Sequence, residues 1–108
     1  MTIKEVSEIV RVQARDGLDL VNRGISLKDA LVEPQKIKVI FRDVKKGKLK
    51  DQIEDVWLVG KEKASDGYRI VMRQEDSQFG LASAGFADDK HLILTGWYGT
   101  LRSAFLGM

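Results

Sequence analysis

The 108-residue sequence predicts a single α+β domain over residues 1–108: an N-terminal helix, a short second helix, an antiparallel meander of about five strands and a C-terminal helix packed on the sheet. Two observations predict this class. Apolar residues recur every three or four positions near the N-terminus, and the period changes to two after Pro34. The strand-like runs that follow are short and are separated by short loops, which is typical of antiparallel neighbours.

The first helix is predicted by a capping box, because Glu5 follows Thr2 by three residues. The apolar positions after it fall on one helical face: Ile3, Val6, Val10, Ala14, Leu18 and Val21. The glycine of Asn22-Arg23-Gly24 predicts the end of this helix.

A second, short helix is predicted over residues 27–32, with Ser26 as its N-cap. Pro34 then keeps Glu33 out of helical conformation. Beyond the proline, apolar and basic residues alternate, as in a strand with one buried and one solvent-exposed face. The apolar residues are Ile37, Val39 and Phe41, and the basic residues are Lys36, Lys38 and Arg42. Ile40 is an exception to this alternation, because it is apolar but falls on the predicted solvent-exposed face.

The remaining strands are predicted from short β-rich runs. A "KKGK" turn leads to "LKDQIEDVW", whose apolar residues have helical spacing, and then to "VWLVG", so a strand is predicted there. "YRIVMR", "FGLASAG" and "HLILT" follow as three more strands. The small residues Gly80, Ala82 and Ala84 share one strand face and leave room for a helix or a ligand. The predicted core comprises Ile37, Val39, Phe41, Ile70, Met72 and Leu92.

The closing helix is predicted to begin at about Trp97, with an apolar stripe of Leu101, Ala104, Phe105 and Met108. Gly99, Ser103 and Gly107 recur every four residues, which predicts close packing on the first helix or on a second copy of the chain. The alternative is a turn over residues 96–99 followed by a shorter helix. Arg102 and the shortness of the apolar run argue against a transmembrane span.

The composition excludes several kinds of chemistry. The chain has no cysteine, which rules out disulfides and thiolate metal sites or nucleophiles. Charges at Lys4, Glu5 and Glu8 interrupt the region where a secretory signal needs an apolar run, so a cytoplasmic protein is expected. The net charge of +2 is too small to indicate a polyanionic partner by itself.

The densest charge feature is the basic hairpin of residues 36–50. Its cations are Lys36, Lys38, Arg42, Lys45, Lys46, Lys48 and Lys50. Such a run can neutralise nucleic-acid phosphates, but no aromatic residue interleaves clearly with the charges. The competing interpretation is a solvated edge hairpin that lysines protect from pairing with other sheets.

Other chemistry-bearing patterns are weaker. Asp88, Asp89 and His91 form a compact acid and imidazole cluster that fits no zinc pattern and is more typical of a turn. The segment "GLASAG" lacks the Lys and Ser or Thr of a phosphate loop. No catalytic residue, metal ligand or cofactor is therefore assigned. Four aromatic residues are candidates for lining a small-ligand pocket between sheet and helices: Trp57, Tyr68, Trp97 and Tyr98.

The sequence thus favours a small non-catalytic interaction module that self-associates as a homodimer through Gly99, Ser103 and Gly107, with another protein as a further partner. Two alternatives stay open. One is a nucleic-acid-binding accessory protein that uses the basic hairpin. The other is a small-ligand-binding protein or enzyme with the aromatic pocket.

Overall fold

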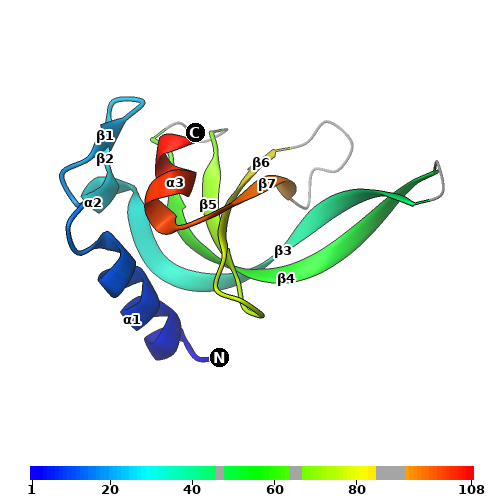
Figure 1. Ribbon diagram of the computed structural model, residues 1–108, viewed down its shortest axis with the longest axis horizontal. Coiled ribbons are helices and arrows are strands. Elements are labelled where there is room, and N and C mark those ends of the chain that lie inside the picture. The colour runs from blue at the N-terminus through cyan, green and yellow to red at the C-terminus, as the bar shows by residue number, and fades with distance from the viewer. Residues whose placement is uncertain (46–47, 64–66, 85–91) are drawn as a thin grey trace.

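The computed structural model describes residues 1–45, 48–63, 67–84 and 92–108 and has a mixed α+β fold (Figure 1). Its elements in chain order are α1 (Ile3–Ala14), β1 (Val21–Asn22), β2 (Ile25–Ser26), α2 (Leu27–Ala30), β3 (Leu31–Lys45), β4 (Lys48–Lys61), β5 (Arg69–Arg73), β6 (Phe79–Ala84), β7 (Leu92–Gly99) and α3 (Leu101–Leu106). The predicted combination of helices with a five-stranded sheet is confirmed.

The sheet closes into a barrel in the order β3-β4-β5-β6-β7. Consecutive strands pair antiparallel, as predicted. The prediction of a purely antiparallel meander is wrong at the closure, where β3 and β7 pair parallel through Val39 with Leu92 and Ile40 with Ile93. An odd number of strands explains this direction: when neighbours alternate, the first and fifth strands point the same way, and sheet twist brings them together.

Two apolar clusters form the core. The smaller takes one buried residue from each strand of the barrel and therefore fills the barrel interior: Val39, Val56, Val71, Ala82 and Leu94. The larger lies between strands β4 to β6 and the three helices and includes Val6, Val10, Leu27, Ile70, Met72, Phe79, Leu81, Leu101 and Phe105. Helices therefore cover the outer face of the barrel along these strands.

The predicted core residues divide between complete and partial burial. Val39, Ile70 and Met72 are fully buried. Ile37, Phe41 and Leu92 are half-buried and pack against the barrel cluster. Strand β5 is covered on both faces, because Val71 points into the barrel while its neighbours point toward the helices. The alternation of side chains predicted which residues of β5 share a face. It did not predict that both faces are buried, one in the barrel interior and one under the helices.

Both N-terminal helices start as predicted and end earlier. The Thr2 hydroxyl accepts from the Glu5 amide at 3.2 Å, and Ser26 accepts from the Asp29 amide at 3.2 Å. The predicted continuation of the first helix to Asn22 is wrong, because the chain turns after Ala14, whose carbonyl accepts from the Gly17 amide. Residues 21–26 form the β1–β2 hairpin instead. Helix α2 ends at Ala30 because Leu31 already belongs to β3.

The closing helix begins later than about Trp97. Strand β7 runs to Gly99, whose φ of +87° turns the chain, and Thr100 caps α3 by accepting from the Ser103 amide at 3.1 Å. The predicted apolar stripe is confirmed in part, since Leu101, Ala104 and Phe105 are fully buried. Met108 is partly buried against the same cluster.

The small residues of β6 make room for Trp97 and not for a helix. A Cβ atom on Gly80 would lie 2.6 Å from Cε3 of Trp97. Ala82 belongs to the barrel cluster, whereas the helices pack beside Phe79 and Leu81 on the opposite face of this strand. The expectation that a helix packs on this face of β6 is therefore wrong.

Candidate interaction surfaces

An open apolar groove of about 270 Å³ lies between α1 and the start of β3. Its apolar lining consists of Val10, Ala14, Leu18, Leu31, Val32 and Pro34, and Ser7 and Arg11 complete the wall. The early end of α1 creates this groove, because the turn through Gly17 carries Leu18 off the helix and leaves it 40% exposed.

The β3 wall of the groove is an irregular part of the strand. Leu31 pairs with Gly60, and regular pairing with β4 resumes only at Gln35. Pro34, which has no N–H to give to a ladder, sits in this interval. The irregularity leaves Val32 half-exposed beside α1 and keeps the groove open.

The outer rim of the groove on α1 is basic. Lys4 and Arg15 share a helical side with Arg11, at spacings of seven and four residues, and all three are exposed. Glu8 is the acid on this side, and Arg11 Nε donates to it at 3.0 Å. That hydrogen bond, reinforced by the charges of Arg11 and Arg15, lowers the pKa of Glu8. Three cations against one carboxylate leave this rim positive.

Two basic residues of β3 stand opposite acidic residues of β4 in the backbone register. Lys38 Nζ donates to Asp55 at 2.9 Å, and this hydrogen bond lowers the pKa of Asp55. The backbone register likewise sets Arg42 opposite Asp51. Lys36 lies over the Trp57 ring, 5.9 Å from its centroid. Lys46 and the side chains of Arg42, Lys45, Lys48 and Lys50 lie outside the described part of the chain.

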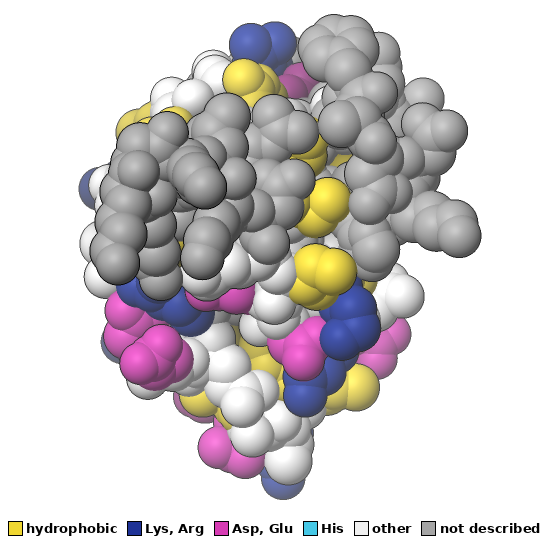
Figure 2. Space-filling model, turned by 90° about the vertical axis from the view of Figure 1, so that its right-hand side faces the viewer, with side chains coloured by type: hydrophobic (Ala, Val, Ile, Leu, Met, Phe, Trp, Pro, Cys, Tyr) yellow, Lys and Arg dark blue, Asp and Glu magenta, His cyan; other side chains and the backbone are white. Residues whose placement is uncertain are grey.

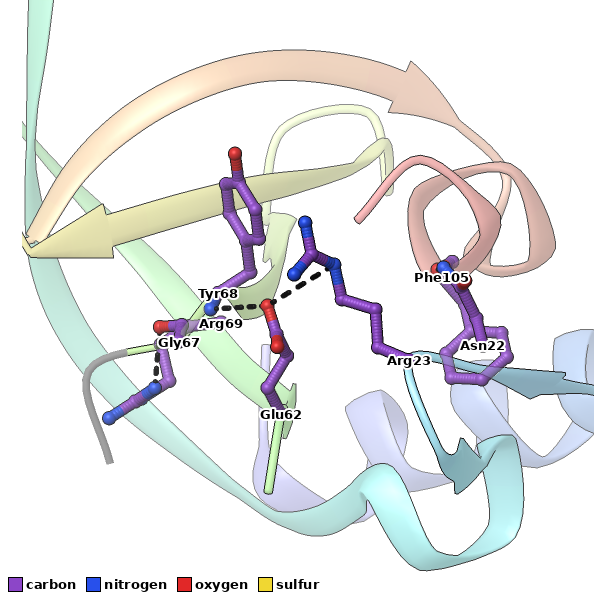
Figure 3. Close-up of polar contacts among 7 residues, drawn as sticks. All are labelled: Asn22, Arg23, Glu62, Gly67, Tyr68, Arg69 and Phe105. Atoms are coloured by element: carbon purple, nitrogen blue, oxygen red, sulfur yellow. Dashed lines mark hydrogen bonds and ion pairs between the residues drawn. The ribbon is translucent and has the colours of Figure 1, made fainter. Parts of the chain in front are cut away.

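A polar network joins the β1–β2 hairpin to the turn between β4 and β5 (Figure 3). Glu62 is 9% exposed, and its Oε1 accepts from the Tyr68 amide at 3.0 Å. Arg23 Nε lies 3.9 Å from the same oxygen, and its guanidinium lies over the Tyr68 ring. Asn22 Nδ2 donates to the Phe105 carbonyl at 2.9 Å. This network holds the hairpin against the end of α3.

Gly99, Ser103 and Gly107 do not form one helical face. Gly99 ends β7, Ser103 is exposed on α3, and Gly107 caps the end of that helix. A Cβ on Gly107 would come within 2.9 Å of the Tyr98 ring, so this glycine packs on an aromatic side chain. Helix α1 reaches α3 elsewhere, where Gln13 Oε1 accepts from the Leu101 amide at 3.2 Å.

The four aromatic residues lie in different surroundings. Trp57 is buried on the helix side of the sheet, with its Nε1 donating to Gln74 at 3.2 Å, and Tyr68 is half-buried there. Trp97 packs against the barrel cluster beneath the Arg73 guanidinium, and Tyr98 is 43% exposed. The structure therefore does not gather them into one pocket. A polar hollow of about 320 Å³ is lined instead by Glu54, Asp55, Arg73, Gln74 and Glu75.

No protein-family model, no curated protein and no solved structure matches the chain. Within the described ranges, no helix is long and apolar enough to cross a membrane. Asp88, Asp89 and His91 lie outside those ranges. The sequence reasoning missed the α1–β3 groove, although Gly17 after Asp16 was a signal that the helix stops before Leu18.

Proposed function

We propose that the protein is a non-catalytic interaction module that binds a partner protein in the α1–β3 groove. The observation that carries this proposal is the groove itself, an open apolar hollow walled by Val10, Leu18, Leu31 and Val32. An apolar hollow on a folded surface can receive an anchoring side chain of a partner protein.

The size of the groove favours a protein anchor over a small ligand. Its volume of about 270 Å³ lies at the lower edge of the range of small-molecule clefts and cavities, about 300–1,000 Å³, and the groove is open to solvent. One or two large apolar side chains of a partner would occupy such a space. Interfaces are commonly anchored by a few side chains of this kind.

The positive charge of the α1 rim indicates which residues of the partner should lie next to that apolar anchor. The α1 rim carries Lys4, Arg11 and Arg15 against Glu8. Charge complementarity therefore favours a partner segment in which an apolar anchor stands next to aspartate or glutamate. A nucleic-acid partner at β3 and β4 is less well supported, because Asp55 pairs with Lys38 and the register sets Asp51 opposite Arg42.

The proposal is tested by selecting binders from a random peptide library on the immobilised protein. We expect the selected peptides to carry large apolar residues next to acidic ones. They should lose most of their affinity for Leu18→Ser, which removes an apolar wall of the groove. Val21→Ser is the matched control, because Val21 is also an exposed aliphatic residue, at 65%, but does not line the groove.

Binding is measured by fluorescence polarisation, with circular dichroism to check that both variants are folded. Peptides that bind Leu18→Ser and wild type equally well would contradict the groove as the site. Selected peptides without acidic residues would contradict the role of the basic rim.

A further inference from the structure

Ile40, the residue that breaks the alternation of β3, belongs to a row of isoleucines across three strands. Val39 points into the barrel, so its neighbour Ile40 points outward. Ile40 stands directly opposite Ile53 on β4 and Ile93 on β7. Paired positions share a face, so these three side chains form one outward isoleucine row.

The isoleucine row lies outside both apolar clusters of the described chain. Ile53 is 59% exposed, whereas Ile40 in the middle of the row is 8% exposed. Figure 2 faces the side from which the β3–β4 hairpin projects in Figure 1 and shows hydrophobic side chains at the surface, with basic and acidic ones beside them. The helices, by contrast, gather at the other end of the barrel (Figure 1).

The pairs on either side of the row are charged, and each joins opposite signs. Lys38 with Asp55 comes before the Ile40–Ile53 pair, and the register sets Arg42 opposite Asp51 after it. In both of these pairs the basic residue is on β3 and the acidic residue is on β4. By register, β3 thus contributes basic residues and β4 acidic residues to the two pairs that flank the Ile40–Ile53 pair.

We propose that this face binds a second copy of the chain about a two-fold axis parallel to the strands and midway between β3 and β4. That axis lays β3 of one copy over β4 of the other. Lys38 then faces the partner's Asp55, and Ile40 faces the partner's Ile53. A surface can pair with itself about a two-fold axis only when it is self-complementary, and this one is so in both charge and apolarity.

The alternative orientation is unfavourable. A two-fold axis in the same plane but perpendicular to the strands would bring β3 over β3 and β4 over β4, so that basic strand would face basic strand and acidic strand would face acidic strand. The same charge pattern makes a polyanion a poor occupant, since Lys38 stands opposite Asp55 and the register sets Arg42 opposite Asp51.

The orientation is tested by charge reversal and mixing, with mass measured by sedimentation equilibrium. Lys38→Asp sets acid against acid across the axis, and Asp55→Lys sets base against base, so each variant alone should shift toward monomer. An equimolar mixture of the two should recover the dimer, because every facing pair then joins opposite charges. The double variant Lys38→Asp/Asp55→Lys should dimerise like wild type and keep the pair within each chain.

The apolar part is tested by Ile53→Lys, which should shift the mass toward monomer. Val12→Lys is the control, because Val12 is an aliphatic residue of α1 with 49% exposure and should leave the mass unchanged. Circular dichroism reports folding of each variant, and the folded double variant serves as the reference if a single reversal unfolds.

Three results would overturn the inference: a wild type that stays monomeric up to about 1 mM, a mixture that fails to recover the dimer, or an Ile53→Lys variant that dimerises unchanged. The outcome is separate from that of the groove. Leu18→Ser should remove most of the peptide affinity without changing the mass, and Ile53→Lys should change the mass without weakening peptide binding.

Discussion

At the scale of single residues, the contact between Gly80 and Trp97 sets how closely β6 and β7 pack. A Cβ on Gly80 would lie 2.5 Å from the Gly96 carbonyl oxygen and 2.6 Å from the Trp97 ring. Gly80→Ala should therefore lower the free energy of unfolding by about 1–3 kcal/mol, the usual cost of overpacking.

Gly96→Ala is the matched control for that change. Its Cβ would meet only Tyr98, at an ordinary 3.8 Å, so its cost should be small. Urea denaturation measures both variants. Equal losses would mean that the close contact at Gly80 is not what excludes a side chain there.

Arg73 fixes the ionisation of Asp76 in the turn between β5 and β6. Its Nε and Nη2 donate to the two carboxylate oxygens at 3.0 and 2.7 Å. These hydrogen bonds, aided by the Gln78 amide, hold the pKa of Asp76 below its ordinary value. Arg73→Gln should raise that pKa toward the ordinary value, as followed by NMR titration of the carboxyl carbon.

The sign of the linked stability follows from that shift. Because the pKa of Asp76 is lower in the folded state than in the unfolded state, the stabilisation is present at neutral pH and is lost as the pH falls through the folded pKa. The stability difference between wild type and Arg73→Gln should therefore shrink in acid. An unchanged titration of Asp76 in the variant would contradict this account.

At the scale of elements, the Glu62 carboxylate links the β1–β2 hairpin to the turn that joins β4 and β5. Glu62→Ala leaves the Tyr68 amide without its acceptor, which should cost about 1–3 kcal/mol of stability. Glu62→Gln keeps an oxygen for that amide and loses only the ion pair with half-exposed Arg23, so its cost should stay below about 1 kcal/mol. Thermal or urea unfolding that shows equal costs would rule out the hydrogen bond as the main contribution.

Local signals predicted where elements start, and tertiary contacts decided where several of them end. The hydroxyls of Thr2 and Ser26 act within one turn of chain, so their caps are readable from the sequence. Trp97 has helical spacing with Leu101, but pairing of β7 with β6 keeps it in a strand. The helical spacing before Trp57 is likewise overridden, because residues 48–57 pair with β3.

The candidate sites were predictable only in part, because tertiary contacts decide which residues lie together in them. Ile40 stood out as an apolar residue on a wet face, yet its partners Ile53 and Ile93 come from strands whose register is set by the closed barrel. Leu18 fitted a helical pattern, and its place in the groove depends on the turn after Ala14. Gly99, Ser103 and Gly107 fitted a helix that does not include Gly99.

At the scale of the whole molecule, the barrel separates the two proposed surfaces. Helix α1 lies at one end, and the β3–β4 hairpin projects at the other (Figure 1). A dimer formed through the isoleucine row would therefore carry two α1–β3 grooves. Such a dimer would bind a partner with two anchors more tightly than either groove alone, because the second contact becomes intramolecular.

The role of the α1–β3 groove as the partner-binding site is checked by NMR chemical-shift mapping of the labelled protein with a selected acidic, apolar peptide. We expect the largest shifts on the amides of α1, Leu18, Leu31 and Val32, and no shift of the amide signals of Ile40 and Ile53. Shifts concentrated on β3 and β4 beyond Ile37, with the groove amides unmoved, would contradict it.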